Sequence, residues 1–129
     1  MEPATRNPER LLPLSPAVLH ILLALADGRE QHGYSMMLKI AAQTAGQFRI
    51  SPTTLYRSIK RMLEQDMIVE TGERPDPELD DERRRYYRLT QLGWYALRAE
   101  IQRLERAVEI AHATPSFGQG LVGRVYGGA

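Results

Sequence analysis

The stretch SPTTLYRSIKRMLEQDMIV, residues 51–69, decides the fold because it holds a helix start, an amphipathic helix and the beginning of a strand. Serine followed by proline is typical of a helix N-terminus, since the serine oxygen accepts an early backbone N–H and proline has no donor to leave unpaired. Apolar residues then recur at helical spacing, at Leu55, Ile59, Met62 and Leu63. Polar and basic residues lie away from that stripe. We therefore predict a helix with a buried face and a positively charged outer face.

The composition places this local charge in context. The chain has 129 residues, a formal charge of +1, 43% hydrophobic residues and no cysteine. One domain with a small appendage is the expectation for this length. The absence of cysteine excludes disulfides, thiolate metal sites and cysteine nucleophiles. No apolar segment is long enough to span a membrane, so we expect a cytoplasmic protein without membrane association. We also expect no cofactor.

The remaining pattern predicts a mainly α fold with a small β-hairpin. Ser15-Pro16 repeats the start signal, and apolar spacing in the second helix follows Tyr34, Met37 and Leu38. The predicted elements are helices at 16–26, 33–45, 51–63 and 91–113, and strands at 68–71 and 86–90. The order of helix, helix, helix, hairpin and helix is that of a winged helix-turn-helix followed by an extra C-terminal helix.

Four segments follow from this order. Residues 1–13 contain three prolines and are predicted to form a flexible N-terminal arm. Residues 14–90 form the predicted DNA-binding domain, and residues 91–113 form a dimerisation helix. Residues 114–129 are rich in glycine and predict a disordered tail.

The last helix carries apolar residues at alternating steps of three and four, which is the spacing of a coiled-coil seam. The seam assigned to dimerisation comprises Leu97, Ile101, Leu104, Val108 and Ala111. Trp94 and Tyr95 lie at its start. We interpret Trp94 first as an anchor of the dimer interface and, in a second interpretation, as part of a binding site with Tyr95 for a planar aromatic effector.

Three ordered motifs resemble the PadR-like winged-helix transcriptional regulators: HGY at 32–34, TLYRSIKRMLE at 54–64 and RRYYRLTQLG at 84–93. The resemblance covers residues 11–113 and is closest to the branch with a short C-terminal helix. It implies a homodimer that represses transcription until a small molecule or another signal relieves it. Two departures stand out: Thr53 replaces the usual glycine, and Asp66-Met67 replaces Gly-Leu before the strand.

The predicted partner is double-stranded DNA with a near-palindromic operator. Helix 51–63 would enter the major groove. The hairpin of strands 68–71 and 86–90, which is the wing, would reach the adjacent DNA backbone. The predicted DNA-binding residues are Arg49, Ser51, Thr53, Thr54, Tyr56, Arg57, Lys60, Arg61, Arg83, Arg84 and Arg85. Cations would supply most of the affinity through phosphates, while Thr53, Thr54, Tyr56 and Arg57 would supply sequence preference.

Other classes of protein fit the sequence less well. The three histidines are too scattered for a metal site, no catalytic motif is present, and we predict that the chain is not an enzyme. Two alternatives stay open. The winged helix could be a protein-interaction module, and the acidic residues that precede Arg83 in the hairpin favour this alternative. It could also be a constitutive architectural DNA binder without an effector.

Overall fold

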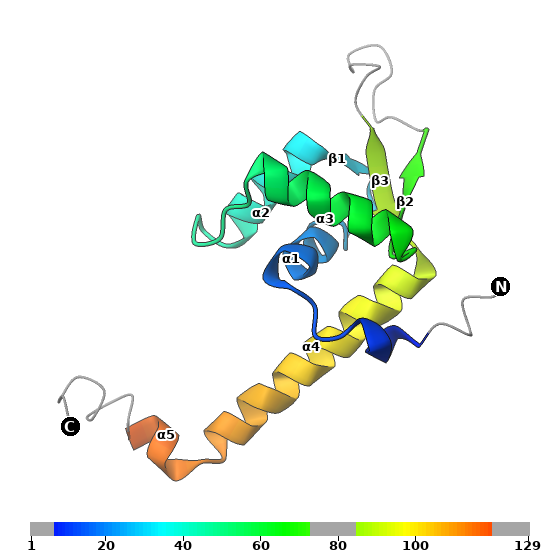
Figure 1. Ribbon diagram of the computed structural model, residues 1–129. Helices are drawn as coiled ribbons and strands as arrows, with labels where there is room; N and C mark the ends of the chain where they lie inside the picture. The colour runs from blue at the N-terminus through cyan, green and yellow to red at the C-terminus, as the bar shows by residue number, and fades with distance from the viewer. Residues whose placement is uncertain (1–6, 73–84, 120–129) are drawn as a thin grey trace. The chain divides into compact units, whose positions relative to one another are not determined.

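The computed structural model (Figure 1) describes residues 7–72 and 85–119. A short 3-10 helix, η2, precedes four longer helices, three short strands and a last short helix. The elements are η2 (Pro8–Leu11), α1 (Pro16–Ala24), β1 (Gln31–His32), α2 (Gly33–Gln43), α3 (Pro52–Glu64), β2 (Ile68–Thr71), β3 (Tyr86–Leu89), α4 (Gln91–His112) and α5 (Pro115–Gln119). The chain forms two compact units, residues 1–99 and 100–129, and the boundary between them falls inside α4. No helix in the described part is long and apolar enough to cross a membrane.

The two serine–proline pairs start helices as predicted. Ser15 Oγ accepts from the Val18 N–H at 3.2 Å, and Ser51 Oγ accepts from the Thr54 N–H at 3.2 Å. In both helices the proline occupies one of the first two positions. These caps are local interactions, which is why the starts of α1 and α3 could be read from the sequence.

The hydrophobic core of residues 1–99 forms where α1, α2 and α3 pack on one another. Its largest fully buried side chains lie in the three helices, directly after α1, and in the turn and strand that follow α3. They are Ile21, Leu22, Leu25, Met36, Ile40, Leu55, Met62, Met67 and Ile68. The predicted inward face of α3 is confirmed: Leu55, Ile59 and Met62 are buried.

The predicted inward face of α2 is wrong by a fraction of a turn. Met36 and Ile40 are buried, whereas Tyr34 and Leu38 are 58% and 55% exposed. Apolar residues on α2 follow helical spacing on two overlapping stripes, so the pattern alone did not decide which stripe faces α1 and α3. Contact with the rest of the fold selects the stripe that begins at Gly33.

The wing contains one strand more than predicted. The antiparallel sheet has the order β1-β3-β2, with Gln31 opposite Tyr87 and Glu70 also opposite Tyr87. Because β3 is the central strand, both Tyr86 and Tyr87 are buried. The ring of His32 packs edge-on against Tyr86 with 5.2 Å between centroids. The three-stranded sheet therefore joins the wing to the start of α2.

The turn after α3 adopts the conformation that glycine favours. Asp66 has a φ of +61°, and its carbonyl accepts a hydrogen bond of 2.5 Å from Thr90 Oγ1. Thr90 Oγ1 also accepts from the Gly93 N–H at 3.0 Å and so caps α4. A Cβ at Gly93 would collide with the backbone carbonyl of Met67. The turn after α3 and the start of α4 are thus held together by the Thr90 hydroxyl and by the close approach of Gly93 to the Met67 backbone.

Candidate nucleic-acid interface

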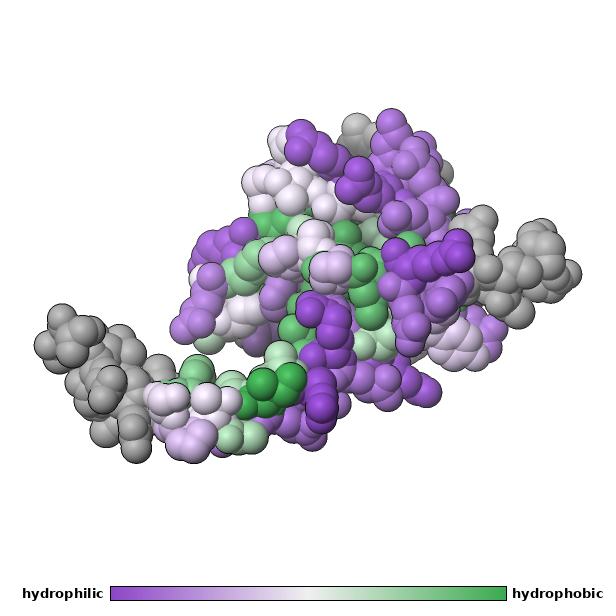
Figure 2. All heavy atoms as spheres, turned by 60° about the horizontal axis from the view of Figure 1, so that its bottom comes forward, coloured by the Kyte–Doolittle hydropathy of each residue, from purple (hydrophilic) through white to green (hydrophobic). Residues whose placement is uncertain are grey.

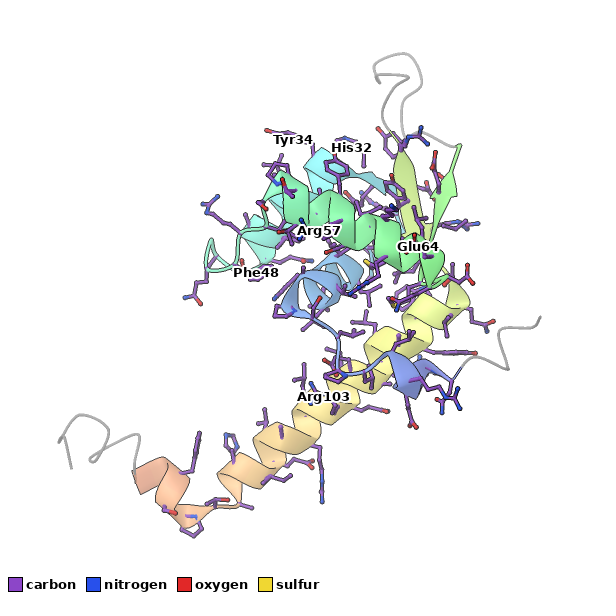
Figure 3. All side chains as sticks on the ribbon, viewed as in Figure 1. His32, Tyr34, Phe48, Arg57, Glu64 and Arg103 are labelled. Atoms are coloured by element: carbon purple, nitrogen blue, oxygen red, sulfur yellow. The ribbon has the colours of Figure 1, made fainter. Side chains whose placement is uncertain are left out.

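The outer face of α3 is solvent-exposed and basic. The structure exposes Thr53, Arg57, Lys60 and Arg61, while the opposite side of the same helix is buried. Figure 3 shows Arg57 on this helix, above α1. Arg49, in the link before the helix, is exposed as well. Four of the predicted DNA-binding cations therefore lie on or next to one helix.

No acid among the described residues forms an ion pair with the cations of this face. In the described part of the chain, the ion pairs join Lys39 to Asp27, Arg85 to Glu70, Arg103 to Glu100 and Arg106 to Glu109. None of them involves Arg49, Arg57, Lys60 or Arg61. An exposed cluster of unpaired cations on one helix gives a locally positive potential on a chain whose net charge is only +1.

The hydroxyl groups at the start of α3 differ in whether they are already hydrogen-bonded within the protein. Ser51 Oγ donates to Thr54 Oγ1 at 3.1 Å while it caps the helix, so these two hydroxyls bond to each other. Thr53 is exposed and forms no side-chain hydrogen bond with the other described residues. Among the three predicted hydroxyl contacts of this turn, its hydroxyl is therefore available without the loss of the bond between Ser51 and Thr54.

Tyr56 joins α3 to the start of α2. Its side chain is 53% exposed, and its ring lies over Gly33, where an added Cβ would come within 2.8 Å of Tyr56 Cζ. A side chain at position 33 would therefore force the phenol of Tyr56 to move away from the start of α2.

The wing residues have different surroundings. Arg83 and Arg84 lie outside the described residues. Arg85 is exposed, and its Nη1 lies 3.2 Å from both carboxylate oxygens of Glu70 on the neighbouring strand. An exposed pair of this kind is weak, so a phosphate could replace the carboxylate. Arg88, which is not among the predicted DNA-binding residues, is also exposed on β3, as its place between Tyr87 and Leu89 in the alternating pattern indicates.

The predicted dimer and effector residues are spread over both units. Leu97 is only 6% exposed and belongs to the core of residues 1–99, whereas Val108 in the second unit is 54% exposed. Ile101, Leu104 and Ala111 are half-buried. In the first unit, Trp94 and Tyr95 are 40% and 45% exposed, and Gln91 Nε2 donates to the Tyr95 hydroxyl at 2.8 Å.

The second unit carries hydrophobic surface of its own. Ile101, Leu104 and Val108 line a surface hollow of about 580 Å³ together with two glutamates. Figure 2 shows hydrophobic side chains at the surface of the segment that leads to the grey C-terminal residues. Val108 and Ile110 are both more than half exposed. Within the described residues, the C-terminal half of α4 thus has an apolar side without a cover.

Two solved structures of regulators share the fold of this chain. A transcriptional regulator from Clostridium thermocellum is 24% identical, with a TM-score of 0.61 over 76% of this chain and 90% of that one. A PadR family transcription regulator from Clostridium difficile is 22% identical, with a TM-score of 0.57 over 74% and 95% of the two chains.

A third neighbour is the DNA-binding protein BpsR from Bordetella bronchiseptica. It is 16% identical, with a TM-score of 0.54 over 89% of this chain and 74% of that one. No curated protein matches the chain closely enough to count as a relative. At these identities the likeness in structure shows the fold alone, and it confirms the predicted winged helix.

The sequence itself identifies the family. Residues 21–99, more than half of the chain, match the transcriptional regulator PadR-like family. Members of this family bind DNA and regulate transcription rather than catalyse reactions, which confirms the prediction that the protein is not an enzyme. The matched residues include all of α2, α3 and the wing. This chain belongs to the PadR-like family of transcriptional regulators.

Proposed function

We propose that the protein is a homodimeric, cytoplasmic repressor that binds a near-palindromic operator and is released from it by an effector. The observation that carries this proposal is the exposed face of α3, where Arg57, Lys60 and Arg61 have no ion-pair partner in the described part of the chain. Phosphate contacts by these cations would supply affinity and fix the position of the helix. Thr53 and Tyr56 would contact base edges, and Arg57, whose guanidinium has five N–H donors, would contact a base edge in addition to a phosphate.

The proposed dimer presents α3 twice. The uncovered apolar side of the C-terminal half of α4, around Leu104 and Val108, supports association with a second copy. A two-fold pair would place its recognition helices about 34 Å apart, one turn of DNA, on two half-sites. Engagement of both half-sites then makes the affinity depend on the geometry of the dimer.

The proposed effector is a planar aromatic molecule held near Trp94 and Tyr95. Both side chains are partly exposed at the start of α4, and a flat ring can stack on an indole. A structural neighbour, BpsR, is described as having its DNA binding regulated by 6-hydroxynicotinic acid. A ligand that changed the spacing of the two α3 helices by a few ångströms would prevent simultaneous contact with both half-sites.

The proposal is tested first by selecting bound sequences from a random pool of duplex DNA. We expect a palindrome whose half-site spacing matches one turn. The double variant Arg57→Ala/Lys60→Ala should then bind this operator at least about tenfold more weakly, with a salt slope reduced by about two, because two phosphate contacts are lost. Arg98→Ala, an exposed cation on α4, is the control for charge removal.

The outcome also separates the alternatives. Unchanged operator affinity in the double variant, with the control unchanged too, would remove α3 as the contact surface. A wild-type protein that selects no sequence and shows no salt-dependent duplex binding would favour the protein-interaction module. Operator binding that no planar aromatic compound weakens would favour the constitutive architectural role.

A further inference from the structure

His32 lies where strand β1 passes into helix α2 (Figure 3), and none of the proposed DNA contacts involves it. Its backbone pairs with Tyr86 of β3, and its ring packs edge-on against the Tyr86 ring with 5.2 Å between centroids. The next residue, Gly33, lies against the Tyr56 side chain of α3. Two consecutive residues therefore contact the wing and the helix that is proposed to enter the major groove.

The imidazole of His32 caps α2. Its Nδ1 accepts a hydrogen bond of 3.3 Å from the Ser35 N–H. The Ser35 hydroxyl completes this capping box, because it accepts from the His32 N–H at 3.1 Å and donates to the His32 carbonyl at 2.9 Å. A ring nitrogen accepts a hydrogen bond only while it carries no proton. The bond from the Ser35 N–H therefore requires the neutral imidazole with its proton on Nε2.

Protonation of His32 acts against this cap in two ways. The imidazolium has a proton on Nδ1 and no longer accepts from the Ser35 N–H. Its positive charge also lies at the N-terminus of α2, which is the positive end of the helix dipole. The two bonds of the Ser35 hydroxyl do not involve the ring and persist. The start of α2 therefore loosens without unfolding, and this is the segment that contacts both Tyr86 and Tyr56.

We propose that neutral His32 is a positioning residue that holds the wing and α3 in the arrangement needed for operator binding, so that mild acid weakens this binding. The inference rests on the proposed operator binding and adds a dependence on pH to it. The expected direction is opposite to the general trend, since a protein that gains positive charge in acid is attracted more strongly to DNA phosphates. A loss of affinity in acid therefore indicates a change of position and not a change of net charge.

Among the described residues around this junction, His32 is the group that ordinarily titrates between pH 5 and 8. Tyrosine phenols stay neutral, arginine stays charged, and carboxylates are ionised over most of that range. The other titratable or charged side chains nearest to His32 along the chain, across the sheet and on α3 are Glu30, Tyr34, Tyr56, Glu70, Arg85, Tyr86 and Tyr87.

The chain offers a direct test because it has three histidines, His20, His32 and His112. The double variant His20→Asn/His112→Asn keeps His32 alone. His32→Asn removes it and supplies a side-chain oxygen that caps a helix at every pH. Ser35→Ala is the structural control, since it removes the half of the capping box that does not titrate. The measurement is operator affinity of the full chain between about pH 8 and about pH 5 at constant ionic strength.

We expect the wild type and the double variant to lose about fivefold in affinity for each half-site as the pH falls, the factor that corresponds to one helix cap. His32→Asn should bind equally well over the whole range. Ser35→Ala should bind more weakly at every pH and keep the wild-type slope. In NMR spectra of the free protein, the amides of Ser35, Tyr56 and Tyr86 should shift with the same midpoint as the His32 imidazole, and these shifts should be absent in His32→Asn.

The results distinguish this inference from the proposed function. A wild type that binds no selected operator at any pH rejects both. A wild type whose operator affinity does not change with pH, or a His32→Asn variant that keeps the wild-type slope, rejects the positioning role alone. A slope that disappears in the double variant assigns the effect to His20 or His112 and rejects it as well. Titration of the His32 imidazole that shifts neither the Tyr56 nor the Tyr86 amide shows that the cap does not reach the two DNA-binding elements, and overturns the inference.

Discussion

The two halves of α4 follow one apolar spacing in the sequence and have opposite surroundings in the structure. In residues 91–99, Leu92, Ala96 and Leu97 are buried in the core of the first unit. In residues 100–112, Val108 and Ile110 are more than half exposed, and Leu104 lines a surface hollow. A continuous heptad therefore does not identify one continuous interface. Its first part serves the fold of the chain, and its second part is the surface proposed for a second copy.

Substitution of one leucine in each half of α4 should have the largest effect, on stability in the first half and on assembly in the second. Leu97→Ala should lower the free energy of unfolding by about 3 kcal/mol, because it leaves a cavity in a packed core. Leu104→Asp should leave the fold of residues 1–99 intact and convert the proposed dimer to monomers, since a carboxylate in an apolar interface is costly to desolvate. Denaturant unfolding and analytical sedimentation measure the two quantities.

The matched control for the second half is Gln102→Asp, an exposed position on the same helix. It should keep both stability and assembly. If Leu104→Asp sediments as the wild type does, the C-terminal half of α4 is not the dimer surface. If Leu97→Ala dissociates the dimer without loss of stability, the division between the two halves is wrong.

Glycine provides the next comparison. Gly93→Ala should cost about 2–3 kcal/mol, because the new Cβ meets the backbone carbonyl of Met67 and the α4 start must shift. Gly118→Ala, in α5 of the second unit, meets nothing within 4 Å and should be neutral or slightly favourable to the helix. Thermal unfolding of the two variants tests whether close backbone packing is confined to the first unit. Equal melting temperatures would contradict the contact at Gly93.

The sequence predicted what local interactions determine. The start and faces of α3 follow from the Ser51 cap and a strongly amphipathic pattern, and both were correct. Strand β1 was missed because two residues carry no periodic signal and become a strand only by pairing with Tyr86 and Tyr87. The face of α2 was wrong because two stripes compete on it.

The turn at Asp66 shows a different limit. The departure from glycine there put the turn geometry in question, yet Asp66 adopts the left-handed conformation that glycine would have. Aspartate tolerates this region better than most residues, and the Thr90 hydroxyl bonds to its carbonyl across 24 positions of sequence. The surface hollow that Ser15 and Val18 of the α1 start line together with Arg57 and Arg61 of α3 could not be predicted either, because its two walls lie 39 to 49 positions apart in the sequence. What tertiary contacts create, a one-dimensional pattern does not reveal.

The smallest predicted effect is the dependence of the first unit on alkaline pH. Burial raises the pKa of the Tyr87 phenol above its usual value of 10.0, and the nearby Glu70 carboxylate acts in the same direction. A raised pKa means that the folded state holds the proton more tightly than the unfolded chain does. The stability that the neutral phenol contributes is therefore fully present below pH 10 and is lost as the pH rises through the folded-state pKa.

Tyr87→Phe should flatten this alkaline loss, while the free energy of unfolding at neutral pH changes little because the ring stays in place. Tyr95→Phe, which removes an exposed hydroxyl from the first half of α4, is the control and should follow the wild-type profile. Denaturant unfolding between pH 8 and about 11 measures the slope. If the free energy of unfolding of Tyr87→Phe falls with pH in parallel with that of the wild type, another group causes the alkaline loss of stability, and Tyr87 on the central strand does not.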